Sequence, residues 1–313
     1  MIALYVALGI IGAALLFYFI PTFLISWRIF FVLFVRNNKK KWARGLSWDN
    51  EEQQKMFDEG EEFFKENESF CKQISIKSGK YSLVGEYFDF GFDKAVIIIH
   101  GRMETCLYSL YFAKPYKESG YNVLAIDNRS HGLSDGRYNT VGLKEYEDII
   151  AWSKKLHDDL GVKEIVYHGL CIGSATALYA LTSENAPDYA KALIAEGMYT
   201  DFRELFKNQL IARKKPLFPA VSEVMCMLSV VSGKNVAKNG PISCIGKMKR
   251  PVLFLYGKKD VFSTPEIAEK VYSACGSKKR LTWFDEGVHS HLRINAPEKY
   301  DNEIKEFLKN GAD

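Results

Sequence analysis

The eight residues HGLCIGSA at positions 168–175 carry the clearest indication of the fold. They come at the end of a strand-like run at 164–169 and open a helical pattern at 172–182. A strand that ends in glycine, any residue, a nucleophile, any residue and glycine makes a sharp turn, because small flanking residues let the backbone turn tightly beneath the central side chain. The central residue of such a turn is usually serine, and here it is Cys171. We predict that Cys171 is a nucleophile held at this turn.

Strand-like and helical patterns alternate on both sides of the turn. The expected strands are residues 73–77, 83–90, 95–100, 122–127, 164–169, 192–196, 251–256 and 280–284. The expected helices are residues 104–119, 143–160 and 172–182. This alternation predicts an α/β fold with a mostly parallel eight-stranded sheet and helices on both faces. A further stretch, at about 200–248, is too long for an ordinary connection and predicts a short helical cap.

Polar groups stand at the ends of three further predicted strands. After the first of them, the backbone N–H of Arg102 would form an oxyanion hole together with the N–H of Ile172. Asp260 and His289 follow the last two predicted strands. The chain order nucleophile, acid, histidine is the one expected with an elbow of this kind. The sequence therefore predicts a catalytic triad of Cys171, His289 and Asp260, in which Asp260 orients the imidazole.

Residues from about 73 to 309 resemble α/β-hydrolases, in particular membrane-anchored bacterial members related to serine aminopeptidases and dienelactone hydrolases. The resemblance rests on five motifs: HG at 100–101, DNRSHGLS at 127–134, GLCIG at 169–173, GKKD at 257–260 and GVH at 287–289. It implies an α/β-hydrolase fold and a mainly structural role for the 127–134 string, which shapes the loop beside the active site. The departure from the family pattern is Cys171, where most relatives carry serine.

Other residues compete for these roles. Glu196 or Asp201 could replace Asp260 as the acid, and His291 could replace His289 as the base. The His-x-His pair also suggests a metal, but no third ligand is evident, so we expect neither a metal nor a cofactor. Three further polar residues are expected to serve structure and not catalysis: Ser174, His157 and His168.

These residues predict a hydrolase that acts on an ester, thioester or lactone through a covalent acyl-enzyme on Cys171. A thiolate leaves more readily than an alkoxide, so bonds with a good leaving group are favoured over plain amides. The expected partner is a small-molecule acyl substrate, and the neighbouring membrane helix makes a lipid-like one plausible. Two alternatives stay open: a catalytically inactive membrane-tethered binding protein on this fold, and an acyltransferase or peptidase of the same fold.

The first 27 residues carry no charged side chain and are long enough to span a bilayer core. A cleaved signal peptide would have a basic start, a shorter apolar core and a small-residue cleavage site, and a helix of a soluble core would have a polar face. We therefore predict a transmembrane anchor at 1–27. The six charged residues among residues 1–44 are all basic and all follow this run. The positive-inside rule then predicts a single-pass protein of the cell membrane with its hydrolase domain on the cytoplasmic side.

The remaining chain divides into three parts. Residues 28–48 form a basic juxtamembrane segment, residues 49–72 an acidic amphipathic linker helix, and residues 73–313 the α/β-hydrolase domain. On this division, residues 1–44 are expected to be dispensable for the folding of the domain. Everything after residue 44 carries a net charge of −2, which argues against a nucleic-acid partner. The six cysteines have no paired spacing, which suits reduced thiols in the cytoplasm.

Overall fold

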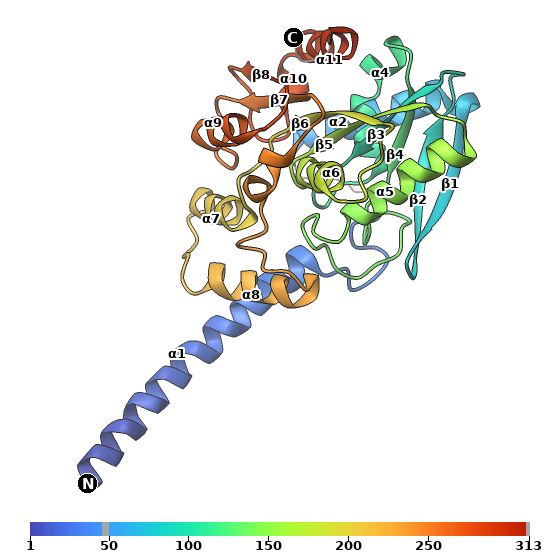
Figure 1. Cartoon of the computed structure of the whole chain (residues 1–313). Helices are drawn as coiled ribbons and strands as arrows, with labels where there is room; N and C mark the ends of the chain where they lie inside the picture. Colours follow the sequence, from blue (N-terminus) through green and yellow to red (C-terminus); the bar gives the residue numbers. More distant parts are fainter. Residues whose placement is uncertain (46–49, 311–313) are drawn as a thin grey trace.

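The computed structural model describes residues 1–45 and 50–310, in which an α/β domain follows a long N-terminal helix (Figure 1). The strands are β1 (Cys71–Ser78), β2 (Tyr81–Phe88), β3 (Lys94–Ile99), β4 (Asn122–Ile126), β5 (Glu164–Leu170), β6 (Ala190–Glu196), β7 (Val252–Gly257) and β8 (Lys279–Phe284). They form one sheet in the order β1-β2-β4-β3-β5-β6-β7-β8. β2 pairs antiparallel with both β1 and β4, and all the other neighbouring strands pair in parallel. The predicted mostly parallel eight-stranded sheet is therefore confirmed.

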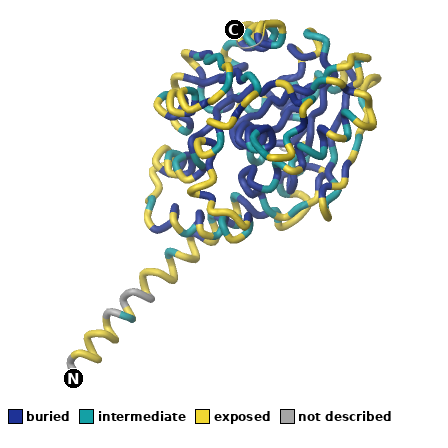
Figure 2. Tube along the Cα trace, viewed as in Figure 1, coloured by how far each residue is buried: buried dark blue, intermediate teal, exposed yellow. Residues whose placement is uncertain are grey.

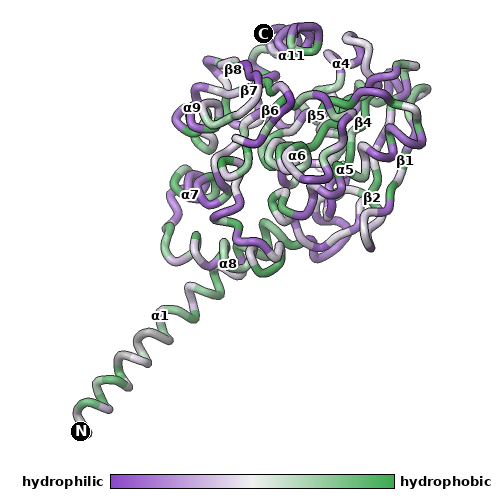
Figure 3. Tube along the Cα trace, in the orientation of Figure 1, coloured by the Kyte–Doolittle hydropathy of each residue, from purple (hydrophilic) through white to green (hydrophobic). Residues whose placement is uncertain are grey.

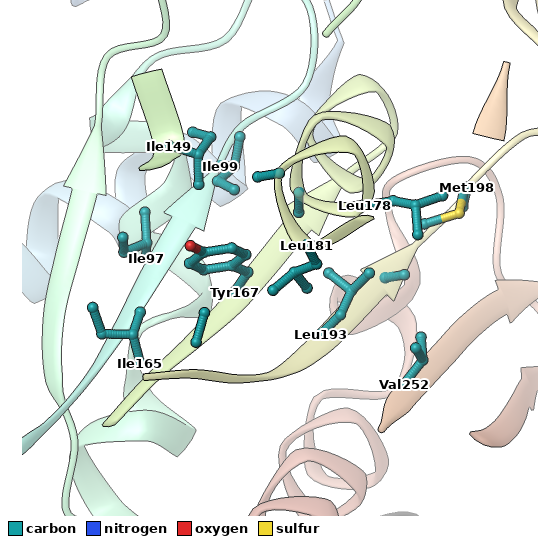
Figure 4. Close-up of a cluster of buried hydrophobic side chains, with 14 of the residues drawn as sticks. Ile97, Ile99, Ile149, Ile165, Tyr167, Leu178, Leu181, Leu193, Met198 and Val252 are labelled. Carbon is teal, nitrogen blue, oxygen red and sulfur yellow. The ribbon is translucent and has the colours of Figure 1, made fainter. Parts of the chain in front are cut away.

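Helices cover both faces of the sheet. One face carries α5 (Tyr146–Lys154), α6 (Ile172–Thr182) and α9 (Pro265–Ala274). The other carries α2 (Glu51–Glu66), α3 (Cys106–Ser109), α4 (Lys114–Glu118), the short α10 (Leu292–Asn295) and α11 (Pro297–Asn310). Figure 4 shows part of the first core, in which Tyr167 of β5 lies beside Leu181 of α6, and Ile97 and Leu178 belong to the same cluster. The central strands β3 to β7 are mostly apolar because their successive side chains enter opposite cores.

Two of the predicted helices are shorter than expected. The pattern at 104–119 is divided into α3 and α4 by a tighter turn at Leu110–Phe112. Pro115 lies in the first turn of α4, where its missing N–H is not needed, so it starts a new helix instead of continuing the first one. The pattern at 143–160 yields α5 followed by a wider helical turn at Lys155–Asp159.

The N-terminal helix α1 (Ile2–Phe34) joins the domain only at its inner end. Its outer part is exposed (Figure 2) and apolar (Figure 3). The window Phe17–Phe34 is long and apolar enough to cross a membrane, and only 17% of it is buried. At the inner end, the ring of Phe34 lies 5.6 Å from that of Phe202 on the cap. The cap helices are α7 (Phe202–Ala212) and α8 (Ala220–Ser232), and α8 crosses α1 (Figure 1).

Residues after α1 also pack on the domain, although the sequence suggested a separate juxtamembrane segment. The Trp42 ring stacks on His131 at 4.7 Å. Arg44 pairs with Asp127 at 2.8 Å and with Glu86 at 2.5 Å. The expected boundary between residues 48 and 49 lies outside the described residues. Structurally, the domain therefore begins before residue 44.

We expect deletion of residues 1–24 to leave a folded domain and deletion of residues 1–44 to destabilise it by on the order of 5 kcal/mol. The longer deletion removes Phe34, Val35 and Trp42, which are all at most 2% exposed, and each large buried side chain contributes about 1.5–3 kcal/mol. Chemical denaturation of both proteins in the same mild detergent measures the difference. Equal unfolding midpoints would contradict this expectation and show that residues 1–44 are dispensable for folding.

Candidate active site

Cys171 lies at the turn between β5 and α6, with φ +53° and ψ −109°. Left-handed backbone is uncommon outside glycine and marks a strained turn. The turn has no room for other side chains: a Cβ on Gly169 would overlap the backbone of Ser174, and one on Gly173 would overlap the carbonyl oxygen of Ile99. The two glycines therefore let α6 approach β3 and β5 closely, with the thiol standing at the carboxyl edge of the sheet.

Asp260 and His289 meet from the loops after β7 and β8. Nδ1 of His289 lies 2.7 Å from Oδ2 of Asp260. Oδ1 of Asp260 accepts the backbone N–H groups of Phe262 and Ser263 at 2.7 and 2.9 Å. Burial acts to raise the pKa of Asp260, but the charge of His289 and these hydrogen bonds outweigh it and hold the pKa below its usual value. The carboxylate is therefore ionised and fixed in its orientation toward the imidazole.

The imidazole of His289 also interacts with Cys171. Nε2 is buried and makes no hydrogen bond of ordinary geometry within the described residues. The side chain of Cys171 is nevertheless near enough to raise the pKa of the imidazole. Burial acts to lower the pKa of His289, but Asp260 and Cys171 together raise it well above its usual value. The structure thus brings all three predicted triad residues together.

The competing residues are engaged elsewhere. Nδ1 of His291 lies 2.6 Å from Oε2 of Glu52 on α2. Glu196 accepts a hydrogen bond from the hydroxyl of Tyr300, and Asp201 caps the N-terminus of α7. In the part of the chain that the structure describes, no cluster of three histidine, cysteine or acidic side chains could hold a metal ion.

The three residues expected to serve structure make structural hydrogen bonds. The hydroxyl of Ser174 donates to the carbonyls of Gly169 and Glu196. His157 contacts a backbone carbonyl through Nδ1 at 2.8 Å. Nε2 of His168 lies 3.0 Å from the Tyr300 hydroxyl.

The loop after β3 is held so that its backbone faces the elbow. The N–H of the residue before Arg102 donates to Glu104 at 2.8 Å, and the N–H of Met103 donates to Nε2 of His131 at 3.2 Å. His131 belongs to the DNRSHGLS string, so this contact fits the structural role that the resemblance implied. The N–H groups of Arg102 and Ile172 donate to no other group in residues 1–45 and 50–310. Both donors therefore remain available to a ligand.

Two buried carboxyl groups lie near His289. Burial raises the pKa of Glu104 to about 8 and that of Glu196 to about 7. The charge of Glu196 adds to the rise for Glu104 and the charge of Asp260 adds to the rise for Glu196, while the charge of His289 opposes both. The sequence offered little to single out Glu104. The only local feature that could have indicated Glu104 is its position three residues after Gly101, at the end of a predicted strand.

We expect Glu104→Gln to remove a pH-dependent loss of stability. Between its usual pKa of 4.5 and the folded value of about 8, the folded state holds a proton that the unfolded state has released. The free energy of unfolding therefore falls as pH rises through this window. Glutamine keeps an acceptor for the backbone N–H without a charge to bury, so the fall should shrink by on the order of a few kcal/mol.

Urea unfolding at about pH 5 and pH 8 measures this difference. Glu298→Gln, at an exposed position of α11, is the matched control. Its free energy of unfolding should differ between the two pH values as much as that of the wild type. If the free energy of unfolding of Glu104→Gln also falls as much as that of the wild type, Glu104 is already ionised in the folded protein and the raised pKa is wrong.

Comparison with known proteins agrees with this fold. A family described as alpha/beta hydrolase fold matches residues 94–220. Among solved structures, the esterase Pf2001 of Pyrococcus furiosus superposes with a TM-score of 0.67 at 25% identity, over 79% of this chain and 93% of the esterase. The chain has the α/β-hydrolase fold and is similar to members of that family.

Three proteins from other organisms are similar to this chain in sequence. The uncharacterized protein YqkD of Bacillus subtilis is 28% identical over 70% of this chain and 72% of its own length. Protein bem46 of Schizosaccharomyces pombe is 28% identical over 62% of this chain. An uncharacterized membrane protein of Saccharomyces cerevisiae, YNL320W, is 24% identical, also over 62% of this chain. The match spans 59% and 62% of the lengths of these two fungal relatives.

Proposed function

We propose that the protein is an acyl hydrolase that cleaves ester, thioester or lactone bonds with Cys171 as nucleophile. The observation that carries this proposal is the position of His289, which contacts Asp260 on one side and interacts with the elbow cysteine on the other. The esterase named among the structural neighbours supports the same class of reaction.

The reaction follows from the roles of these groups. The thiolate of Cys171 attacks the acyl carbonyl carbon, and the carbonyl electron pair moves to the oxygen, where the N–H groups of Arg102 and Ile172 receive it. As the intermediate collapses, the bond to the leaving group breaks and His289 gives that group its proton from Nε2. Water, deprotonated by His289, then attacks the thioester and releases the acid. Asp260 stabilises the imidazolium each time it forms.

A panel of acyl substrates tests the proposal. The full-length protein in detergent should hydrolyse activated esters, thioesters or lactones, and intact-mass spectrometry should detect the acyl group on Cys171 after brief exposure. Transfer of the acyl group to an added alcohol or amine in preference to water would instead indicate an acyltransferase. No turnover and no adduct with any substrate would reject the proposal in favour of an inactive binding protein.

We also place the protein in a membrane through α1, with the domain on the cytoplasmic side. The apolar exposed length of α1 and the yeast relative named as a membrane protein support anchoring, and the basic residues after the helix support this orientation. Protease added to intact cells should leave the domain uncut until the membrane is permeabilised. Digestion without permeabilisation would reverse the orientation.

A further inference from the structure

An apolar groove lies between α1 and the cap helix α7. It has a volume of about 470 Å³. Ile25, Ile29 and Val32 of α1 form one wall, and Phe206 and Leu210 of α7 form the other. Because the part of α1 that precedes the groove is exposed and apolar, a membrane around α1 would meet the groove at its outer end. The groove is therefore placed to receive an apolar chain from the bilayer.

A cation without an ion-pair partner among the described residues adjoins this groove through a hydrogen bond to one of its lining residues. Nη2 of Arg102 donates to Oε1 of Gln209, a groove residue, at 3.2 Å. The guanidinium also lies 5.2 Å from the centre of the Phe34 ring. Its Nη1 atom is buried and has no hydrogen-bond partner, and no described carboxylate lies within ion-pair distance of this side chain.

This cation keeps its charge beside the nucleophile. Burial lowers the pKa of Arg102 to about 10, with Cys171 acting to raise it and Arg213 to lower it, so the guanidinium is protonated at neutral pH. A guanidinium nitrogen that is buried without a hydrogen-bond partner, such as Nη1 here, is unfavourable. A ligand that supplies an anion at Nη1 would remove this cost and be held next to Cys171.

The charges along the groove have the same sign. Arg28, Arg213 and Lys215 line it together with the apolar residues, and no acidic side chain does. Basic side chains next to an apolar groove complement the phosphate and the acyl chain of an anionic lipid.

We infer that the groove binds an anionic membrane lipid, with its acyl chain between α1 and α7, its phosphate on Arg102 and its ester carbonyl at Cys171. The simplest member of this substrate class is a monoacyl glycerophosphate. Turnover of such a lipid rests on the proposed function of Cys171, whereas its binding in the groove does not.

Photo-crosslinking to a variant that cannot hydrolyse the lipid separates binding of the lipid from its turnover. The full-length Cys171→Ala protein is placed in phosphatidylcholine vesicles with a monoacyl glycerophosphate that carries a diazirine in its acyl chain. Peptide mapping should find crosslinks on residues 25–33 of α1 and 206–213 of α7. A phosphocholine analogue with the same chain should crosslink about tenfold less.

Three additional substitutions assign the contacts. Arg102→Met should reduce the crosslinking of the anionic lipid about tenfold to the level of the analogue. Val32→Trp, which fills the groove from a half-exposed position, should reduce crosslinking of both lipids. Lys207→Met, at an exposed position of α7 outside the groove, should change neither. Thermal unfolding of each variant shows whether it is folded.

Two results would overturn the inference. Absence of crosslinks on both segments in the parent protein would show that the groove is not the lipid site. Equal crosslinking of both lipids, unaffected by Arg102→Met, would show that the guanidinium does not recognise the anion. Neither result bears on whether Cys171 hydrolyses other esters, which the substrate panel decides.

Discussion

We expect Cys171→Ala to form no acyl-enzyme and to lose hydrolytic activity on the order of 10⁴- to 10⁶-fold. Alanine leaves the N–H groups of Arg102 and Ile172 in place, so substrate still binds, but no atom remains that can attack the carbonyl. The measurement is kcat/KM with an activated ester, together with intact mass after brief exposure. Cys226→Ala, at an exposed position of α8, is the matched control and should behave as the wild type.

Cys171→Ser distinguishes loss of the nucleophile from loss of the fold. The elbow, His289 and the two backbone donors all remain, so ester hydrolysis should stay measurable. A serine hydroxyl must lose its proton during attack and its oxygen lies closer to the backbone than sulfur does. We therefore expect a loss of several powers of ten on thioesters, at about 1.4 kcal/mol per tenfold. If the alanine variant acquires the acyl mass at the wild-type rate, the nucleophile lies elsewhere.

Local patterns were sufficient to predict the sheet and the elbow. The apolar runs at β3, β5 and β7 needed no partner to be recognised as buried strands, and α6 has the expected bounds. The glycines at 169 and 173 were required by close backbone approaches that the motif itself encodes. The pattern at 104–119 misled because helical periodicity continued across Pro115, which begins a helix there and does not extend one.

Long-range pairs account for what the sequence could not supply. The choice between His289 and His291 depended on which carboxylate each ring meets, and Glu52 lies 239 residues away from the second. Likewise, the sequence shows Arg44 only as one of several basic residues that follow the apolar run. Its hydrogen bond to Asp127, 83 residues away in the sequence, shows that it packs on the domain. Neither pairing has a signature in spacing, periodicity or composition.

The same limit explains why the side chain of Arg102 was missed. The role of its backbone N–H in an oxyanion hole was predicted from its position after a strand, which is a local feature. The environment of its guanidinium is built by α1 and α7, from Phe34 and Gln209, and exists only after the cap has folded over the inner end of α1. The cap and the inner end of α1 thus form part of the candidate site.

The second large effect is expected for Asp260→Asn, which should lower the rate of acyl-enzyme formation on the order of 10²- to 10⁴-fold. Asparagine cannot stabilise the imidazolium of His289, and its amide can donate to Nδ1, which would leave the proton on Nε2 facing the thiol. Because Asp260 helps to raise the pKa of His289, its neutral replacement should let the imidazolium lose its proton at lower pH. The alkaline limb of the pH–rate profile should therefore move to lower pH.

The chain contains its own control for this substitution. His291 and Glu52 form a second histidine–carboxylate pair, at 2.6 Å against 2.7 Å for His289 and Asp260, but this pair is not joined to the elbow cysteine. Glu52→Gln should therefore leave both the rate and the pH–rate profile unchanged. If the two substitutions lower activity equally, the effect comes from loss of a structural ion pair. If only Asp260→Asn lowers the rate and moves the alkaline limb, the carboxylate acts through the imidazole of His289, as the triad requires.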